Sequence, residues 1–185
     1  MIFSLNLVFR LILVAIIYIL IMGSVMMGLH LLYGHSTSEA FAFGFRMGLI
    51  YGAITFLCSG ISHVQGIRRR GFKLSGKNLN IVHKRSMLLR LPSAQAVDVV
   101  RAALNQLPRT VIQENKSSSH KLVATSKITW SSWGEKIVFQ IQPELDNMTQ
   151  VLFSSRPRIP TNIIDCGKNL ENVERISAYL SPYTV

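Results

Sequence analysis

The chain has 185 residues, with 20 Lys and Arg against nine Asp and Glu, and a formal net charge of +11. Its two cysteines exclude a disulfide-stapled fold and are typical of a domain in a reducing compartment. The basic excess lies almost entirely after residue 67, where 18 Lys and Arg face eight acids. A domain with this balance favours anionic partners, such as lipid headgroups, nucleic acid or an acidic protein surface.

Two uncharged apolar stretches, residues 11–32 and 47–67, occupy the first third of the chain. Each is long enough to cross a hydrocarbon layer of about 30 Å as a helix. The first is much longer than the apolar part of a signal peptide, and no small-residue cleavage site follows it. The sequence therefore predicts a transmembrane helical hairpin over residues 1–67.

The charges that flank the two stretches predict an orientation. The connection between them carries only Glu39 and Arg46, whereas residues 68–90 hold eight basic residues and no acid. Because an excess of Lys and Arg marks the cytoplasmic side, we expect a multi-pass protein of the bacterial inner (cytoplasmic) membrane with both termini cytoplasmic. Residues 68–84 are then a basic juxtamembrane linker. We expect five of its cations to contact anionic lipid or a partner: Arg68, Arg69, Arg70, Lys73 and Lys77.

Glycines recur on one face of the second stretch. Gly44, Gly48 and Gly52 are spaced by four residues, and the first stretch carries Gly23 and Gly28. Small residues at this spacing let helix backbones approach closely in a membrane. They predict a glycine-zipper contact, either within the hairpin or between subunits of a homo-oligomer.

Residues 85–185 are expected to form one cytoplasmic α+β domain. Pro92 and Pro108 bound an amphipathic helix for which Ser93 is the expected N-cap, and Asn169 is expected to cap a final helix. The alternation of Ile137, Phe139 and Ile141 is typical of a half-buried strand. Together the patterns predict an antiparallel sheet with two helices, in the order β-α-β4-α, which is helix-grip-like. The expected strands cover residues 86–91, 110–114, 121–130, 136–142 and 148–155, and the first helix covers 94–107.

Sequence motifs of catalysis, metal binding and cofactor binding are missing. The sequence has no phosphate-binding glycine loop, no Cys-x-x-Cys and no His-Glu-x-x-His. Histidines 30 and 63 fall at opposite ends of the expected hairpin, so one chain cannot clamp a haem between them. We therefore expect neither a metal nor a cofactor. An enzyme remains an alternative only through an isolated reactive group, namely Asp165, Glu135, or Cys166 with its thiol activated by Lys168 and a helix N-terminus.

Two tryptophans flank a turn in the middle of the domain. Trp130 and Trp133 are candidates for a ligand, partner or membrane contact, and Arg156 and Arg158 lie on a later segment that could join them. A cytoplasmic ligand- or lipid-binding module tethered to the membrane is therefore a second interpretation. Membrane-tethered nucleic-acid binding is less favoured, because Phe72 is the only aromatic residue within the basic linker.

The last 35 or so residues combine a Ser- and Arg-rich strand, an Asp-x-Gly-x-Asn turn and a closing amphipathic helix. This segment resembles an uncharacterised bacterial family of small α+β domains, from which Pro157 and Pro160 depart. The resemblance implies no activity. It is carried by Ser154, Ser155, Arg156, Arg158, Asp165, Gly167 and Asn169.

These observations favour a non-enzymatic accessory or adaptor subunit of a bacterial inner-membrane assembly. It would act through anionic-lipid contacts and contacts with other membrane-protein subunits. The two binding-module interpretations stay open beside it.

Overall fold

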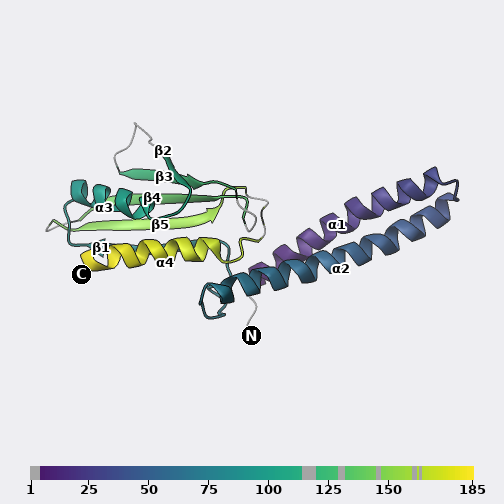
Figure 1. Ribbon diagram of the computed structural model, residues 1–185, viewed down its shortest axis with the longest axis horizontal. Helices are drawn as coiled ribbons and strands as arrows, with labels where there is room; N and C mark the ends of the chain where they lie inside the picture. The colour runs from purple at the N-terminus through teal and green to yellow at the C-terminus, as the bar shows by residue number, and fades with distance from the viewer. Residues whose placement is uncertain (1–4, 114–119, 129–131, 145–146, 160–161, 163) are drawn as a thin grey trace.

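The computed structural model describes residues 5–113, 120–128, 132–144, 147–159, 162 and 164–185. A long helical hairpin and an α+β domain lie end to end, with the domain against the end of the hairpin that is farther from its loop (Figure 1).

The hairpin consists of α1 (Leu5–Leu32) and α2 (Thr37–Arg69). Both helices are long and apolar enough to cross a membrane, with mean hydropathies of 2.6 and 1.6. Only 6% and 17% of their apolar windows are buried within the chain, whereas the core helix of a soluble protein would be mostly buried. The second helix begins ten residues before its expected apolar stretch. The cause is a capping box, in which the side chains of Ser36 and Glu39 bond each other's backbone N–H.

The domain contains a five-stranded antiparallel sheet in the order β1-β5-β4-β3-β2. The central pair is in register from Glu135 opposite Pro157 to Pro143 opposite Thr149. This arrangement confirms the expected α+β class. The strands are β1 (His83–Leu89), β2 (Thr110–Gln113), β3 (Lys121–Ser126), β4 (Glu135–Pro143) and β5 (Thr149–Pro157).

One face of the sheet is covered by α3 (Ser93–Asn105) and α4 (Lys168–Leu180), with η1 (Ser181–Tyr183) after them. The rings of Phe139 and Phe153 stack at 5.4 Å between centroids on this inner face. They pack with buried Val100, Leu104 and Ile176 of the helices. The space between α4 and the sheet is therefore filled by side chains.

Several expected boundaries were wrong. Ser93 is not the N-cap of α3, because Pro92 holds that place and no side chain caps the helix. Asn169 does not cap α4, because the chain turns into the helix at Gly167 in the left-handed conformation, with φ +80°. Strand β1 begins three residues before position 86, and β3 ends at Ser126, ahead of residues 129–131, which lie outside the described part.

Candidate functional site

The two helices of the hairpin meet along three glycines of α2. A methyl group at Gly44 or Gly48 would lie 2.6 Å from the carbonyl oxygen of Gly23 or Ile19, respectively. A methyl at Gly52 would collide with the side chain of Ile19. We call the contact of Gly44, Gly48 and Gly52 with Ile19 and Gly23 the glycine seam. At these three positions of α2 the helices are too close to admit a Cβ. Gly28 is not part of it, since a Cβ there meets nothing within 4 Å.

The C-terminal end of α2 touches the domain through two further glycines. A Cβ on Gly66 would collide with the carbonyl and Cβ of Cys166, so α2 and the loop before α4 are in backbone contact. Gly167 approaches from the other side, and a Cβ there would lie 2.9 Å from Cγ1 of Ile67. We call this contact between residues 63–70 of α2 and residues 164–171 the joint.

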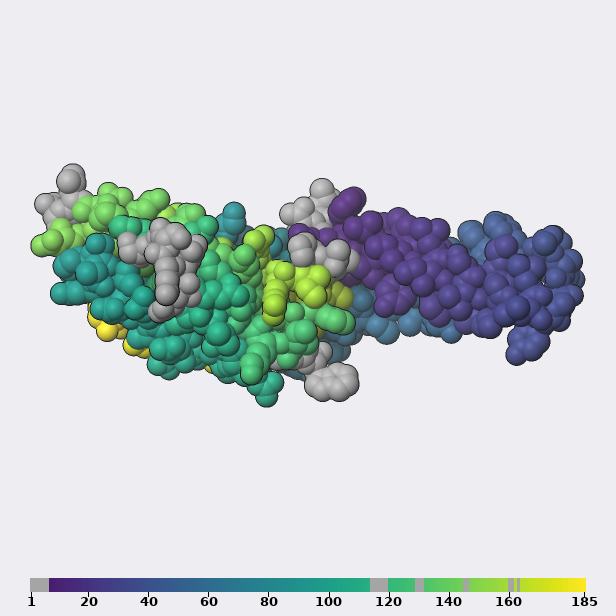
Figure 2. All heavy atoms as spheres, turned by 90° about the horizontal axis from the view of Figure 1, so that it is seen from above, coloured from purple at the N-terminus to yellow at the C-terminus, as the bar shows by residue number. Residues whose placement is uncertain are grey.

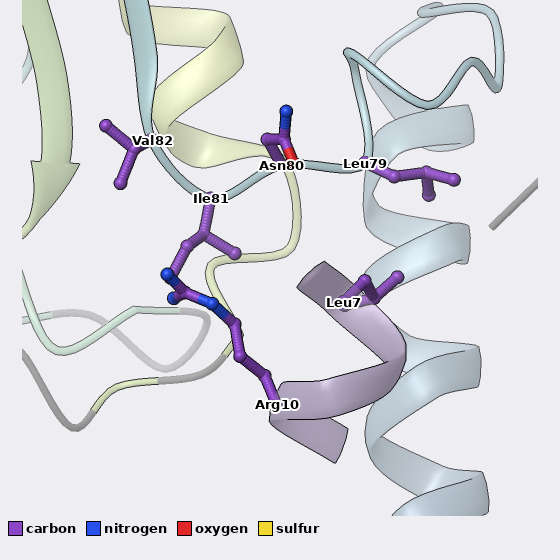
Figure 3. A pocket seen from close by; sticks show the side chains of 6 residues that line it. All are labelled: Leu7, Arg10, Leu79, Asn80, Ile81 and Val82. Carbon is purple, nitrogen blue, oxygen red and sulfur yellow. The ribbon is translucent and has the colours of Figure 1, made fainter. Parts of the chain in front are cut away.

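Apolar side chains from three segments fill the space beside the joint. Leu7 and Leu11 of α1, Ile67 of α2 and Leu79 of the linker are each at most 2% exposed. A small pocket of about 160 Å³ lies next to them, and Figure 3 shows the Arg10 side chain extending from α1 toward Ile81 of the linker. The start of α1, the end of α2 and the linker are therefore packed as one unit.

Arg70 is the main polar contact of the joint. Its Nη1 donates to the carbonyl oxygens of Gly66 at 3.1 Å and Cys166 at 2.6 Å, and its Nε donates to Oε2 of Glu171 at 2.8 Å. The sequence predicts an anionic lipid or partner contact for Arg70. In the structure its Nε and Nη1 instead bond groups of the chain itself.

Glu171 gathers three cations at the start of α4. Besides Arg70, its carboxylate contacts Lys168 Nζ at 3.1 Å and Arg175 Nη2 at 2.7 Å. Burial, the largest single influence, raises the pKa of this carboxyl. The hydrogen bonds from Arg70 and Lys168 and the nearby positive charges together outweigh it, so the pKa of Glu171 is lower than usual. The carboxylate is thus held in its charged form.

A buried histidine and a buried aspartate meet at the centre of the joint. His63 is 0% exposed, and its Nε2 lies 3.1 Å from the carbonyl oxygen of Leu79. Because a carbonyl only accepts, Nε2 carries the hydrogen. The other ring nitrogen lies 3.5 Å from Oδ1 of Asp165, which is 1% exposed.

The same aspartate organises the start of α4. Its Oδ2 accepts from the backbone N–H of Asn169 at 2.8 Å and from Nδ2 of that residue at 2.9 Å. Ser155 of β5 donates in turn to Oδ1 of Asn169 at 2.6 Å. A chain of buried hydrogen bonds therefore runs from the sheet through α4 to Asp165, and ends beside the hairpin.

The expected reactive groups Asp165 and Glu135 are buried and hydrogen-bonded within the chain. Asp165 is bonded to Asn169. Burial, followed by the charge of Asp165, raises the pKa of the Cys166 thiol, which corrects the expected activation by Lys168. The carboxylate of Glu135 is 2% exposed and accepts from the hydroxyls of Ser126 and Ser132.

The other face of the sheet has no helix of the described chain on it. We call it the open face. Its centre mixes apolar and polar side chains, with Val138 opposite Ser154 and Gln140 opposite Leu152. Toward one end, Lys136 of β4 lies directly opposite Arg156 of β5. Like charges in this position repel each other. Lys84 of β1 lies opposite Ser154, which is the next residue of β5 on this face after Arg156. A shallow groove of about 420 Å³ crosses strands β1, β5 and β4. By strand alternation the face comprises Lys84, Ser86, Leu88, Val111, Gln113, Lys121, Val123, Thr125, Lys136, Val138, Gln140, Gln142, Gln150, Leu152, Ser154 and Arg156.

The remaining expected contacts lie near the hairpin. Trp133 is 60% exposed in the β3–β4 turn, and Trp130 lies outside the described residues. The backbone N–H of Arg158 donates to the carbonyl oxygen of Gly134 at 2.9 Å, which ties the end of β5 to this turn. Figures 1 and 2 both show this end of the sheet beside the end of the hairpin that is farther from its loop. The cations Arg68, Arg69, Lys73 and Lys77 are exposed nearby.

Sequence reasoning missed the joint itself. His63 reads as an ordinary polar residue near a helix end, and Gly66 as one more helix glycine. One signal for a close contact was present in the sequence. Gly66 lies outside the regular spacing of Gly44, Gly48 and Gly52, in a segment that is no longer purely apolar.

No model of a known protein family matches the sequence, and no curated protein matches it as a relative. Among solved structures, the chain is similar to a Thermobifida fusca protein, target TfR85A, at 14% identity and a TM-score of 0.35, over 54% of this chain and 87% of that one. It is also similar to the di-domain ARO/CYC StfQ from the steffimycin biosynthetic pathway, at 11% identity and a TM-score of 0.33, over 73% of this chain and 58% of that one. Both scores are too low to transfer a fold or a function.

Proposed function

We propose that this chain is a non-enzymatic adaptor subunit of a bacterial inner-membrane assembly. The hairpin spans the membrane twice with both termini cytoplasmic, and the α+β domain presents its open face to an acidic surface of another subunit. The observation that carries the proposal is the pairing of Lys136 with Arg156 on that face, with Lys84 one strand away.

Repulsion between these cations is relieved when an anionic group binds between them. Four of the described acids are not free to neutralise these cations: Glu135 and Asp165 are buried, and Glu171 and Glu174 are paired with cations on the helix side of the sheet. The joint supports the same proposal. It fixes the open face relative to the hairpin, so a partner bound there is held at a defined place beside the membrane.

The test is purification of the full chain from its native membrane in mild detergent, followed by mass spectrometry of proteins and lipids. We expect a stoichiometric protein partner with the wild type and its loss when Lys136→Glu and Arg156→Glu are combined. Arg90→Glu is the control for position, because it makes the same charge change as either single substitution at the opposite end of β1, where the Arg90 backbone bonds Tyr183. A wild-type protein that purifies without another protein would contradict the adaptor proposal.

A second candidate is a ligand-binding module, and the groove on the open face favours it. The groove joins apolar Val138 and Leu152 to the cation Lys84, so it suits an anionic amphiphile such as a lipid. The helix-grip likeness supports this candidate less, because the space where such folds hold ligands is filled by Phe139 and Phe153. A homo-oligomer that purifies with one retained lipid would favour it. Nucleic acid ranks lower, since the open face in the described strands has no aromatic side chain for base stacking.

A further inference from the structure

An apolar groove of about 500 Å³ opens along the hairpin near the joint. Its floor is Gly60, where a Cβ would meet only Cδ1 of Leu11, at 3.4 Å. Leu11 and Phe56 form parts of its walls, and its cytoplasmic end is marked by Gln65 and Arg68. The volume lies within the range of about 300–1,000 Å³ that is usual for small-molecule sites.

The polar end of the groove carries an unsatisfied charge. Arg68 is exposed, and no hydrogen bond or ion pair joins its guanidinium to another side chain in the described part of the chain. Arg70, two residues on, bonds the joint through its Nε and Nη1, and Arg69 does not line the groove. The groove therefore combines an apolar slot with one free planar cation at its end, which is suited to a phosphate group.

We propose that this groove binds one anionic phospholipid of the inner leaflet, with an acyl chain over Gly60 and the phosphate on Arg68. The proposal rests on the hairpin spanning the membrane as set out above. Its inner end then lies at the depth where acyl chains meet headgroups.

A helix from a second copy is the competing occupant. The glycine seam, which would be the natural surface for such a helix, is already covered by α1 at Gly44, Gly48 and Gly52. A helix laid in the groove would also have to accommodate Arg68 at its end, whereas a lipid headgroup pairs with it.

The test uses the full chain in phosphatidylcholine vesicles with a trace of phosphatidylglycerol that carries a photoreactive group on one acyl chain. After illumination, peptide mass spectrometry should locate the label on residues 56–68 and 8–11. Unlabelled phosphatidylglycerol should compete for it, and unlabelled phosphatidylcholine should not. We expect Arg68→Gln to lower labelling roughly fivefold, the effect of losing one cation beside an anionic headgroup.

Two matched controls separate the site from the bilayer as a whole. Arg69→Gln should lower labelling of the groove much less than Arg68→Gln does, because that side chain is outside the groove. Gly60→Leu should abolish labelling of the groove by filling it, while Gly28→Leu should not, since position 28 has open space around it. Equal labelling of all variants, or equal competition by both lipids, would overturn the proposal, as would a cross-link to a second copy in the groove.

Failure of the lipid site and failure of membrane insertion give different distributions of the photoreactive label along the chain. If the hairpin spans the bilayer but the groove is not selective, label spreads evenly over the lipid-facing residues of both helices. If the hairpin does not enter the bilayer, neither helix is labelled, and the proposed function fails with the site.

Discussion

Gly66 is the residue at which the two parts of the molecule come closest. A methyl group there would collide with the backbone of Cys166, which cannot rotate away as the end of a side chain could. We expect Gly66→Ala to push α2 away from α4 and to cost about 1–3 kcal/mol, the usual cost of overpacking. The measurement is limited proteolysis of the linker, residues 70–82, in detergent, where cleavage should become several-fold faster than in the wild type.

Gly76→Ala is the control for this prediction. It lies in the same linker region, and a Cβ there meets nothing within 4 Å, so proteolysis should stay at the wild-type rate. If Gly66→Ala were cleaved no faster than Gly76→Ala, the backbone contact of the joint would not exist in solution.

His83, at the start of β1, gives the domain a defined acid sensitivity. Burial lowers the pKa of its imidazole below 6.5, against a weaker opposing influence of its hydrogen bond with the Asn80 carbonyl. The folded state therefore disfavours the protonated ring. The contribution of neutral His83 to the free energy of unfolding is complete above about pH 6.5. It is lost as the pH falls from there through the lower pKa of the folded state. We expect His83→Gln to flatten the fall in melting temperature between pH 7 and pH 5, as followed by circular dichroism of the full chain in detergent.

Protonation of Glu171 causes a second loss of folding stability at lower pH. Its folded pKa lies below 4.5, so its contribution is present above that value and disappears as the pH falls through the folded pKa. The His83→Gln variant should therefore match the wild type above pH 7 and lose stability with it below pH 4.5. A variant as pH-sensitive as the wild type between pH 7 and pH 5 would show that His83 is not the group that titrates.

At the scale of the elements, the glycine seam determines how the hairpin packs. We expect Gly48→Leu to separate α1 from α2, because even a methyl group there would lie 2.6 Å from the Ile19 carbonyl oxygen. The helices are not expected to unfold, since each is apolar enough to remain in a membrane alone. Cysteines introduced at Leu11 and Gly60, where a Cβ on residue 60 would meet only Leu11 across the two helices, should be joined by a short bifunctional reagent in a chain without Cys58 and Cys166. The same pair should fail to cross-link with Gly48→Leu. Gly28→Leu, outside the seam, should leave the cross-link intact.

The elements were easier to predict from sequence than the contacts between them. Strand β4 was evident because Ile137, Phe139 and Ile141 alternate, and the alternation directly reports one buried face. The start of β1 was missed because His83 and Lys84 are polar, and their pairing with Ser155 and Ser154 depends on β5, some 70 residues away. The joint was missed for the same reason. Local patterns contain no information about His63 meeting Asp165, which only the folded chain brings together.

At the scale of the whole molecule, the joint couples the side of the membrane on which the domain lies to the orientation of the hairpin. Because Arg70 and Gly66 hold the domain against α2, the domain lies on whichever side of the membrane receives the inner end of the hairpin. The eight basic residues that follow predict the cytoplasm. We expect a single cysteine at Ser38, in the first turn of α2, to react with an impermeant maleimide added to intact spheroplasts, in a chain without Cys58 and Cys166.

A cysteine at Gly76 is the complement, since it lies in the linker on the domain side of the hairpin. It should react only after the membrane is opened. The reverse pattern would place the open face outside the cell, where the cytoplasmic partner proposed here could not reach it. Labelling of both positions in intact spheroplasts would show that the hairpin lies on the surface. The lipid groove and the adaptor proposal would then fail together, because both depend on the inner end of the hairpin lying at the cytoplasmic headgroups.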